Sequence, residues 1–310
     1  MNQNRRDFIK LTGLATSATL LSSLESFSTA PAPIVNTNGN YKLKVLATNW
    51  GFDGTIDAFC ARAKKEDYDG IEQWWPDAKE EQKELFDALF KHKLEVGFLC
   101  GVGESNAKVH LQSLKKVIDG FYLATKQNPL YINLHSGRDY FSFEENCKII
   151  EYTLQEAKQS GIPIYHETHR GRMLYAAHVT KDFINKYPEL KLTLDISHWC
   201  NVHESLLDDQ PETIELALQR TEHIHARIGY AEGPQVNDPR APEWEGTVKQ
   251  HFTWWDKVVE RKKKNGETMT FLTEFGPPLY MPTLPHTLQP VSDQWAINVH
   301  MLQLLRKRYS

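Results

Sequence analysis

The sequence predicts an α/β protein that folds as a single (β/α)8 TIM barrel. Three observations lead to this fold class. Short runs of β-forming residues alternate with longer helix-forming runs, eight times between Tyr41 and the C-terminus. About 270 residues take part, which is the usual size of one eight-unit barrel. The first strand is followed by Thr48 to Phe52, which is not the glycine-rich phosphate turn of a doubly wound sheet.

The expected strands are short and rich in apolar residues, and each precedes a helical run. Such alternation implies parallel strands covered by helices. The eight strands are expected over Lys42–Thr48, Gly70–Trp75, Leu94–Leu99, Leu130–His135, Pro163–Thr168, Lys191–Ile196, His223–Ile228 and Met269–Phe275.

The expected helices fill the intervals between these strands, and the sixth of them has the weakest pattern. They are expected over Thr55–Lys65, Lys79–His92, Lys108–Lys126, Phe143–Gln159, Val179–Lys186, Pro211–Leu218, Val248–Lys263 and Val291–Arg306. No internal sequence repeat accompanies this alternation.

The N-terminal residues are expected to lie outside the barrel. Arg5 and Arg6 precede an apolar run from Leu11 to about Leu24, and small residues follow at Ser28 to Ala30. This order is typical of a twin-arginine export signal; an ordinary amphipathic helix is the alternative. We therefore expect a signal over residues 1–30, a spacer over 31–40, a catalytic barrel over 41–310, and a periplasmic or otherwise exported protein.

Composition excludes several classes of protein. The net charge is −4, and Lys262 to Lys264 is a short basic run at a predicted helix end, so nucleic-acid binding has no electrostatic support. The four cysteines lie far apart and form no CxxC pair, which argues against a zinc ribbon. No apolar stretch is long enough for a stable membrane span. The sequence does not decide between a monomer and an oligomer.

Four consecutive strands end in residues that can bind a metal ion: Glu167, Asp195, His225 and Glu274. Reacting groups of such barrels lie at the carboxyl ends of the strands. Carboxylates gathered there repel one another unless a cation lies between them. His223 is the rival of His225, but His225 lies nearer the open end, so we expect His223 to be a packed core histidine.

The identity of the metal follows from the chemistry of these ligands. Three carboxylates and one imidazole form an oxygen-rich, fairly hard site. Mn²⁺ fits such a site best, Co²⁺ and Mg²⁺ also fit it, and Zn²⁺ remains an alternative.

These segments resemble the xylose-isomerase-like TIM-barrel superfamily, above all its sugar epimerases, over about residues 42 to 306. Asp195 to His198 resembles an Asp-x-x-His segment, which implies that Asp195 binds metal and His198 faces the substrate. His223-Ile224-His225 resembles a His-x-His strand whose second histidine is the ligand. Glu274 lies in a segment that resembles the final glutamate segment, and Glu167 occupies the position of the first glutamate.

The resemblance implies a sugar isomerase or epimerase. The metal would stabilise the enediolate that forms when the α-proton is lost, and Glu167 and Glu274 would remove and return that proton. The sequence departs from the epimerases after the metal-binding histidine, where Ala226 and Arg227 replace the usual Gly-Glu pair. This departure leaves the identity of the sugar open, and we expect Arg227 to contact it.

Further residues at strand ends fit a carbohydrate ligand. His135 ends the fourth strand and is expected either to handle a proton or to be a core histidine. Glu72, in the second strand, is expected at the substrate or behind another group of the site. Indole rings stack on sugars but also fill protein cores, so at least one tryptophan near a strand end is expected to bind sugar. These tryptophans are Trp50, Trp74, Trp75 and Trp199.

Two alternative functions remain open at this point. A 3-keto-glycoside lyase would begin with the same proton removal, with His135 as a plausible base, and would then eliminate the aglycone. A metal-stabilised sugar-binding module would keep the tryptophans and catalyse nothing. A role like that of endonuclease IV is disfavoured, because such enzymes need a basic face and more histidines. In each favoured case the partner is a small carbohydrate.

Overall fold

The computed structural model describes residues 40–124 and 129–310. The predicted export signal over residues 1–30 and all of the spacer except Asn40 lie outside the described residues. Residues 40 to 310 form one compact unit.

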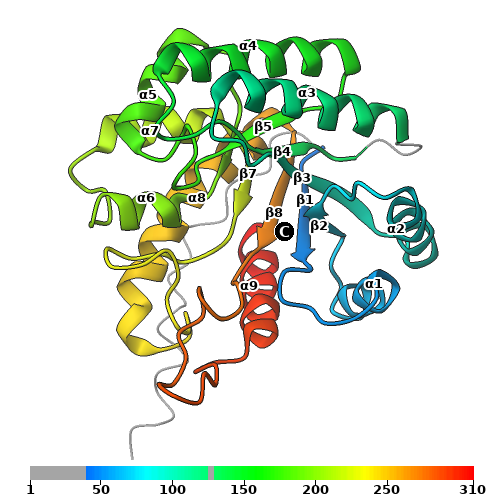
Figure 1. Cartoon of the computed structure of the whole chain (residues 1–310). Helices are drawn as coiled ribbons and strands as arrows, with labels where there is room; N and C mark the ends of the chain where they lie inside the picture. The colour runs from blue at the N-terminus through cyan, green and yellow to red at the C-terminus, as the bar shows by residue number, and fades with distance from the viewer. Residues whose placement is uncertain (1–39, 125–128) are drawn as a thin grey trace, which may run out of the picture. The chain divides into compact units, whose positions relative to one another are not determined.

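Eight parallel strands close into a barrel in the order of the sequence (Figure 1). Closure is made by β1 and β8, which pair along six positions from Lys42 opposite Thr268 to Ala47 opposite Thr273. The predicted (β/α)8 barrel is therefore confirmed. The strands are β1 Lys42–Thr48, β2 Gly70–Trp74, β3 Glu95–Gly101, β4 Ile132–His135, β5 Ile164–Glu167, β6 Leu192–Leu194, β7 Thr221–His225 and β8 Thr268–Thr273.

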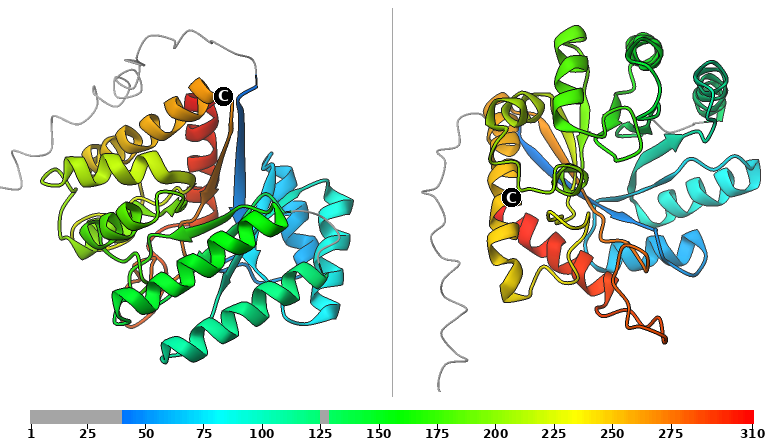
Figure 2. Two further views of the ribbon diagram at one scale, coloured as in Figure 1. Left: turned by 90° about the horizontal axis from the view of Figure 1, so that it is seen from above. Right: turned by 60° about the vertical axis from the view of Figure 1, so that its left-hand side comes forward.

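The helices lie outside the strands, as both views of Figure 2 show. Among the described residues, none of them is long and apolar enough to cross a membrane. They are α1 Ile56–Lys65, α2 Lys79–His92, α3 Ala107–Ala124, α4 Phe143–Ser160, α5 Ala177–Lys186, α6 Ile196–Val202, α7 Pro211–Arg220, α8 Glu245–Asn265 and α9 Gln294–Tyr309, with a 3-10 turn, η2, over Pro242–Trp244.

Side-chain caps fix where several helices begin. Thr55 accepts a hydrogen bond from the backbone N–H of Ala58 at the start of α1. Ser142 and Glu145 form a reciprocal capping box at the start of α4. Each cap satisfies backbone N–H groups that the first turn leaves without partners. These caps place the helix starts within a residue or two of the predicted ones.

The chain after β6 differs from the prediction. The sequence predicts a strand through Ile196, but β6 ends at Leu194 and the short helix α6 begins at Ile196. Asp195 is the N-cap of α6, and its side chain accepts a hydrogen bond from Ser197 N. Aspartate at an N-cap stabilises a helix start, and here it overrides the strand preference of Ile196.

The chain after β7 also turns earlier than predicted. The strand ends at His225 and not at Ile228, and Arg227 N donates a hydrogen bond to His225 O at 3.0 Å. Gly229 then passes close to α6, because a Cβ atom on it would lie 2.6 Å from Ser197 Cα. Only glycine allows this approach, which brings the segment after β7 against the start of α6.

Candidate functional site

The structure brings the four predicted metal ligands together at the open end of the barrel. Glu167 ends β5, Asp195 follows β6, His225 ends β7 and Glu274 follows β8. Each has less than a tenth of its surface exposed. Ligand atoms of Asp195, His225 and Glu274 lie within 4.8 Å of one another, and the Glu167 Oε1 atom lies 3.7 Å from His225 Nδ1.

Two buried atoms of this cluster have no hydrogen-bond partner: His225 Nδ1 and Glu274 Oε2. They lie 2.9 Å apart, so that they contact each other as an ion pair only when the imidazole is protonated. Buried polar atoms are rarely left without a partner, because each loses its hydration on burial. A lone pair on an imidazole and one on a carboxylate, facing the same space, suit a cation. The residues therefore fit a divalent metal ion.

His225 is held from behind by Glu72. The His225 Nε2 atom lies 3.2 Å from Glu72 Oε1. A carboxylate only accepts hydrogen bonds, so a proton on Nε2 would be directed at Glu72 and would leave the lone pair of Nδ1 to the cluster. Nε2 also lies 3.2 Å from the Asn133 amide nitrogen. Glu72 is only 2% exposed and also contacts His223, with Glu72 Oε2 3.3 Å from His223 Nε2. Glu72 thus lies behind His225, in contact with both histidines of β7.

The charges of the cluster favour a positive ion. Burial would lower the pKa of His225, but Glu274, Glu167 and Glu72 outweigh it and raise that pKa well above its ordinary value. Without a metal, the carboxylates thus draw a second proton onto the ring. A divalent cation would take the place of that proton.

Arg227 extends into this cluster from the segment after β7. It is 2% exposed, and its Nη2 atom donates a short hydrogen bond to Asp195 Oδ2. Its Nε atom donates to Ser197 Oγ at 3.2 Å, and Nη2 lies 3.6 Å from Glu274 Oε2. Burial raises the pKa of Asp195 to about 6, although the Arg227 guanidinium opposes this shift. Arg227 therefore shares a carboxylate with the candidate metal position.

His198 and His135 contact different carboxylates of the cluster. His198 is fully buried in α6, with Nε2 3.5 Å from Asp195 Oδ2. His135 ends β4, keeps 13% of its side chain exposed and places Nε2 3.0 Å from Glu167 Oε2. Burial would raise the pKa of Glu167, yet the neighbouring His135 and His225 imidazoles hold it well below its ordinary value.

The tryptophans divide between the mouth and the core. Trp50 packs over Gly276 and is 37% exposed, and Trp74 is 50% exposed with its ring edge-on to His135. Trp75 instead packs against Phe98 and Phe121 in the core, and Trp199 is fully buried and donates to a backbone carbonyl. The structure therefore does not place Trp75 and Trp199 where a sugar ring could stack on them.

Three residues that the sequence did not single out surround His198. His169 stacks against it with ring centroids 4.0 Å apart. Arg170 lies 4.8 Å from the centre of the Tyr280 ring, and Arg227 lies 4.7 Å from the same ring. His169 shares the inward face of Glu167 by strand alternation, which was a usable signal. Tyr280 lies in the β8–α9 segment, where no periodic pattern marks it.

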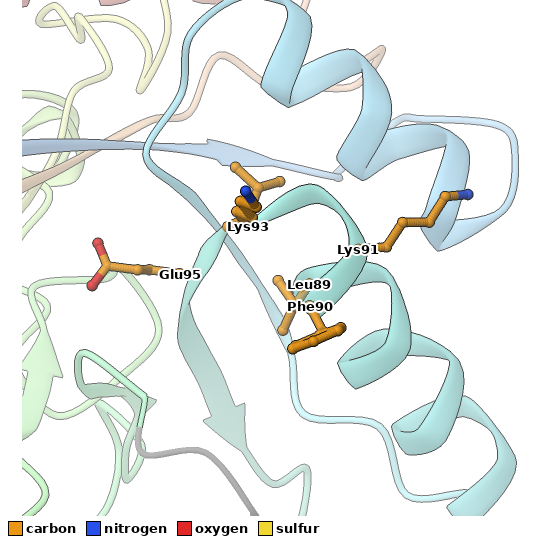
Figure 3. A pocket seen from close by; sticks show the side chains of 6 residues that line it. Leu89, Phe90, Lys91, Lys93 and Glu95 are labelled. Carbon is orange, nitrogen blue, oxygen red and sulfur yellow. The ribbon is translucent and has the colours of Figure 1, made fainter.

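A separate surface pocket lies at the other end of β3. It is lined by Leu89, Phe90, Lys91, Lys93, Leu94 and Glu95, which join the end of α2 to the start of the strand (Figure 3). Parallel strands start at the end of the barrel opposite the candidate site. This pocket is therefore not part of the ligand cluster.

Solved structures with similar folds include several enzymes at low sequence identity. The 3-keto-D-glucoside 4-epimerase from E. coli is 14% identical, with a TM-score of 0.55 over 86% of this chain and 100% of that chain. An AP endonuclease of family 2 from Brucella melitensis is 14% identical, with a TM-score of 0.58 over 86% and 99%. A probable 3-DHS dehydratase from Bacillus anthracis is 16% identical, with a TM-score of 0.51 over 86% and 100%. These likenesses establish the fold.

The search of curated proteins finds no match to the sequence. The family described as xylose isomerase-like TIM barrel matches residues 60–263, about two thirds of the chain. Together with the closed barrel of eight parallel strands, this match places the protein: the chain belongs to the xylose isomerase-like TIM-barrel family.

Proposed function

We propose that this protein is a divalent-metal-dependent enzyme that isomerises or epimerises a sugar by removing a proton next to a carbonyl group. The observation that carries the proposal is the set of four buried ligands with two unpartnered atoms, His225 Nδ1 and Glu274 Oε2. The exposed rings of Trp50 and Trp74 at the mouth suit a sugar. One protein of similar fold is a 3-keto-D-glucoside 4-epimerase, which supports a keto-sugar substrate.

Glu167, Asp195, His225 and Glu274 would hold the metal ion. When bound, the ion would supply a Lewis acid that lowers the energy of the enediolate left after proton loss. Glu72 would keep the His225 ring in the orientation that leaves Nδ1 free.

Glu167 and Glu274 would move the proton. The pKa of Glu167 is held low by its imidazole neighbours, so its carboxylate is ionised and able to accept a proton. Glu274 approaches His225 Nδ1, as Glu167 does, but extends from a different strand end, and it would return the proton to the other face of the substrate carbon. For a simple isomerisation, one glutamate would serve both steps.

Proton exchange tests this proposal. We would load the protein with Mn²⁺, incubate it with a panel of ketoses and keto-glycosides in deuterated water, and follow deuterium uptake next to the carbonyl by NMR. Uptake that needs both the metal and Glu167 supports the proposal. Sugar binding without any exchange across the panel would contradict it and leave a sugar-binding module.

A keto-glycoside lyase is the second candidate, and the position of His135 favours it. This histidine is the most exposed of the groups that contact Glu167, and it lies beside the exposed ring of Trp74. In such a reaction His135 would take the α-proton, and the aglycone would leave from the neighbouring carbon. Release of free aglycone from a 3-keto-glycoside, lost in His135→Ala, would identify a lyase.

A further inference from the structure

Arg170 stands at the mouth of the barrel with its charge unpaired. It follows β5, three positions after Glu167, and is half-buried. Within the described ranges 40–124 and 129–310, no carboxylate forms an ion pair with it. Its guanidinium lies over the Tyr280 ring at 4.8 Å, and its Nη1 atom lies 3.3 Å from His198 Nδ1.

Other arginines near this end of the barrel have acceptors. Arg138 and Arg172 each donate to a backbone carbonyl of the β3–α3 segment, those of Gly103 and Val102. Arg227, on the same Tyr280 ring as Arg170, donates to Asp195 and to Ser197. In the described part of the chain, the one possible acceptor near the Arg170 guanidinium is the ring nitrogen of His198.

His198 cannot accept from both arginines. Its Nε2 atom lies 2.9 Å from Arg227 Nη2, and its Nδ1 atom lies 3.3 Å from Arg170 Nη1. An imidazole offers at most one acceptor nitrogen when neutral and none when protonated. The shorter contact assigns that acceptor to Arg227. Among the described residues, the five N–H donors of Arg170 are then left without an acceptor, beside a His198 Nδ1–H that also lacks one.

We propose that Arg170, with His198 Nδ1, forms a subsite for an anionic group on the substrate. A guanidinium binds the two oxygens of a carboxylate or phosphate in parallel, and a fixed fork beside a second donor favours such a group over a hydroxyl. The substrate would accordingly be a sugar acid or a phosphorylated sugar. This inference rests on the proposed function, because it assumes that the cluster beside Arg170 takes a sugar.

Calorimetric binding to the Mn²⁺-loaded protein tests the subsite without turnover. The probes are D-glucose, D-glucuronate and D-glucose 6-phosphate. We expect at least one anionic probe to bind about tenfold or more tightly than D-glucose, since hydrogen bonds between charged groups are worth about that factor or more. The tighter of the two anions identifies carboxylate or phosphate as the group recognised.

Two variants test whether the preference for an anionic probe depends on Arg170. Arg170→Met should remove it and bring the anionic probe to the affinity of D-glucose. The matched control is Arg62→Met, because Arg62 also lies over an aromatic ring, 4.1 Å from that of Trp295, but belongs to α1. That control should keep the full preference.

Equal affinities for all three probes in the wild-type protein would overturn the inference, and this comparison needs no variant to fold. A preference that persists in Arg170→Met would also overturn it, because the anion would then contact the metal or another cation. The outcome is separable from the proposed function. Deuterium exchange on a neutral keto-sugar without any preference for an anion would contradict the subsite but not the proposed reaction. An Arg170-dependent preference for an anion without exchange on any sugar would contradict the proposed reaction but not the subsite.

Discussion

His223 and His225 lie two residues apart on β7, and both are fully buried inside the barrel, yet their surroundings differ. His223 Nε2 lies 3.0 Å from the Tyr131 hydroxyl, and its Nδ1 lies 2.8 Å from the Thr270 hydroxyl. His225 has Glu72 and Asn133 at Nε2, and its Nδ1 atom lies 2.9 Å from Glu274 Oε2 without a hydrogen bond. Burial therefore does not separate a core histidine from a candidate ligand, whereas a ring nitrogen without a hydrogen bond does.

The same contrast holds for the two layers of the barrel interior to which these histidines belong. The lower layer contains Tyr131 and Thr270, which occupy both nitrogens of His223. The upper layer gathers carboxylates that only accept hydrogen bonds. Such a layer needs protons or a cation, and we infer that it is built for a cation.

The largest effect on metal binding is expected when each of the two histidines is replaced in turn. His225→Ala should abolish tight metal binding, because it removes a ligand and leaves three carboxylates unshielded. His223→Gln should keep the metal and lose about 1–3 kcal/mol of unfolding free energy, the cost of unpaired buried partners. Elemental analysis and thermal unfolding measure the two effects. Equal metal loss in both variants would contradict the distinction between the layers.

The two glutamates should show the next largest effect. Glu167→Gln and Glu274→Gln should keep metal when it is supplied in excess, because an amide oxygen still donates a lone pair. Each should lose about a hundredfold or more in the rate of proton exchange, because an amide cannot accept and release a proton at neutral pH. The rate of deuterium uptake next to the carbonyl group, followed in deuterated water, measures this effect. Near wild-type exchange in both metal-loaded variants would remove the glutamates from the mechanism.

The sequence predicted the barrel well because each unit carries a local pattern and a local cap. It also predicted that Glu167, Asp195, His225 and Glu274 converge, since the ends of parallel strands meet at one end of a barrel. The prediction failed for Trp75, because a shift of one residue along the chain decides whether a ring faces the mouth of the barrel or its core. Because β2 ends at Trp74, this ring faces the mouth, whereas the next residue, Trp75, packs under α3.

Residues in the segments that follow strands were beyond sequence reasoning. Arg170 and Tyr280 meet across the mouth from segments more than a hundred residues apart, and neither segment has a periodic pattern. The turn at Asp195 had a signal, since aspartate before a helix-forming run is a common N-cap, but the neighbouring isoleucine favoured a strand.

A smaller effect on metal affinity is expected for Glu72, which lies behind the candidate ligand His225. Glu72→Gln should weaken metal affinity by about tenfold to a hundredfold, the usual effect of losing a carboxylate that orients a histidine ligand. Glu95→Gln is the matched control, because Glu95 pairs with Lys44 where β3 begins, at the other end of the barrel. Competition with a fluorescent chelator measures both affinities. Unchanged affinity in Glu72→Gln would show that the His225 ring is positioned by other contacts.

The smallest effect is a dependence of metal affinity on pH. The pKa of His225 is raised well above its ordinary value by the surrounding carboxylates, and a metal ligand must lose that proton. Apparent affinity should therefore rise about tenfold per pH unit below that pKa, with release of one proton per ion. Calorimetry in buffers of different ionisation enthalpy counts the protons, and no release at neutral pH would contradict the predicted charge of His225.

The most direct test of the account is the metal content of the wild-type protein. The full chain would be incubated in turn with Mn²⁺, Co²⁺, Mg²⁺ and Zn²⁺, passed through a desalting column and analysed for metal per polypeptide. We predict one tightly held ion per chain with at least one of these metals, Mn²⁺ foremost. Retention of no ion with any of the four would contradict a metal centre at the ends of β5 to β8.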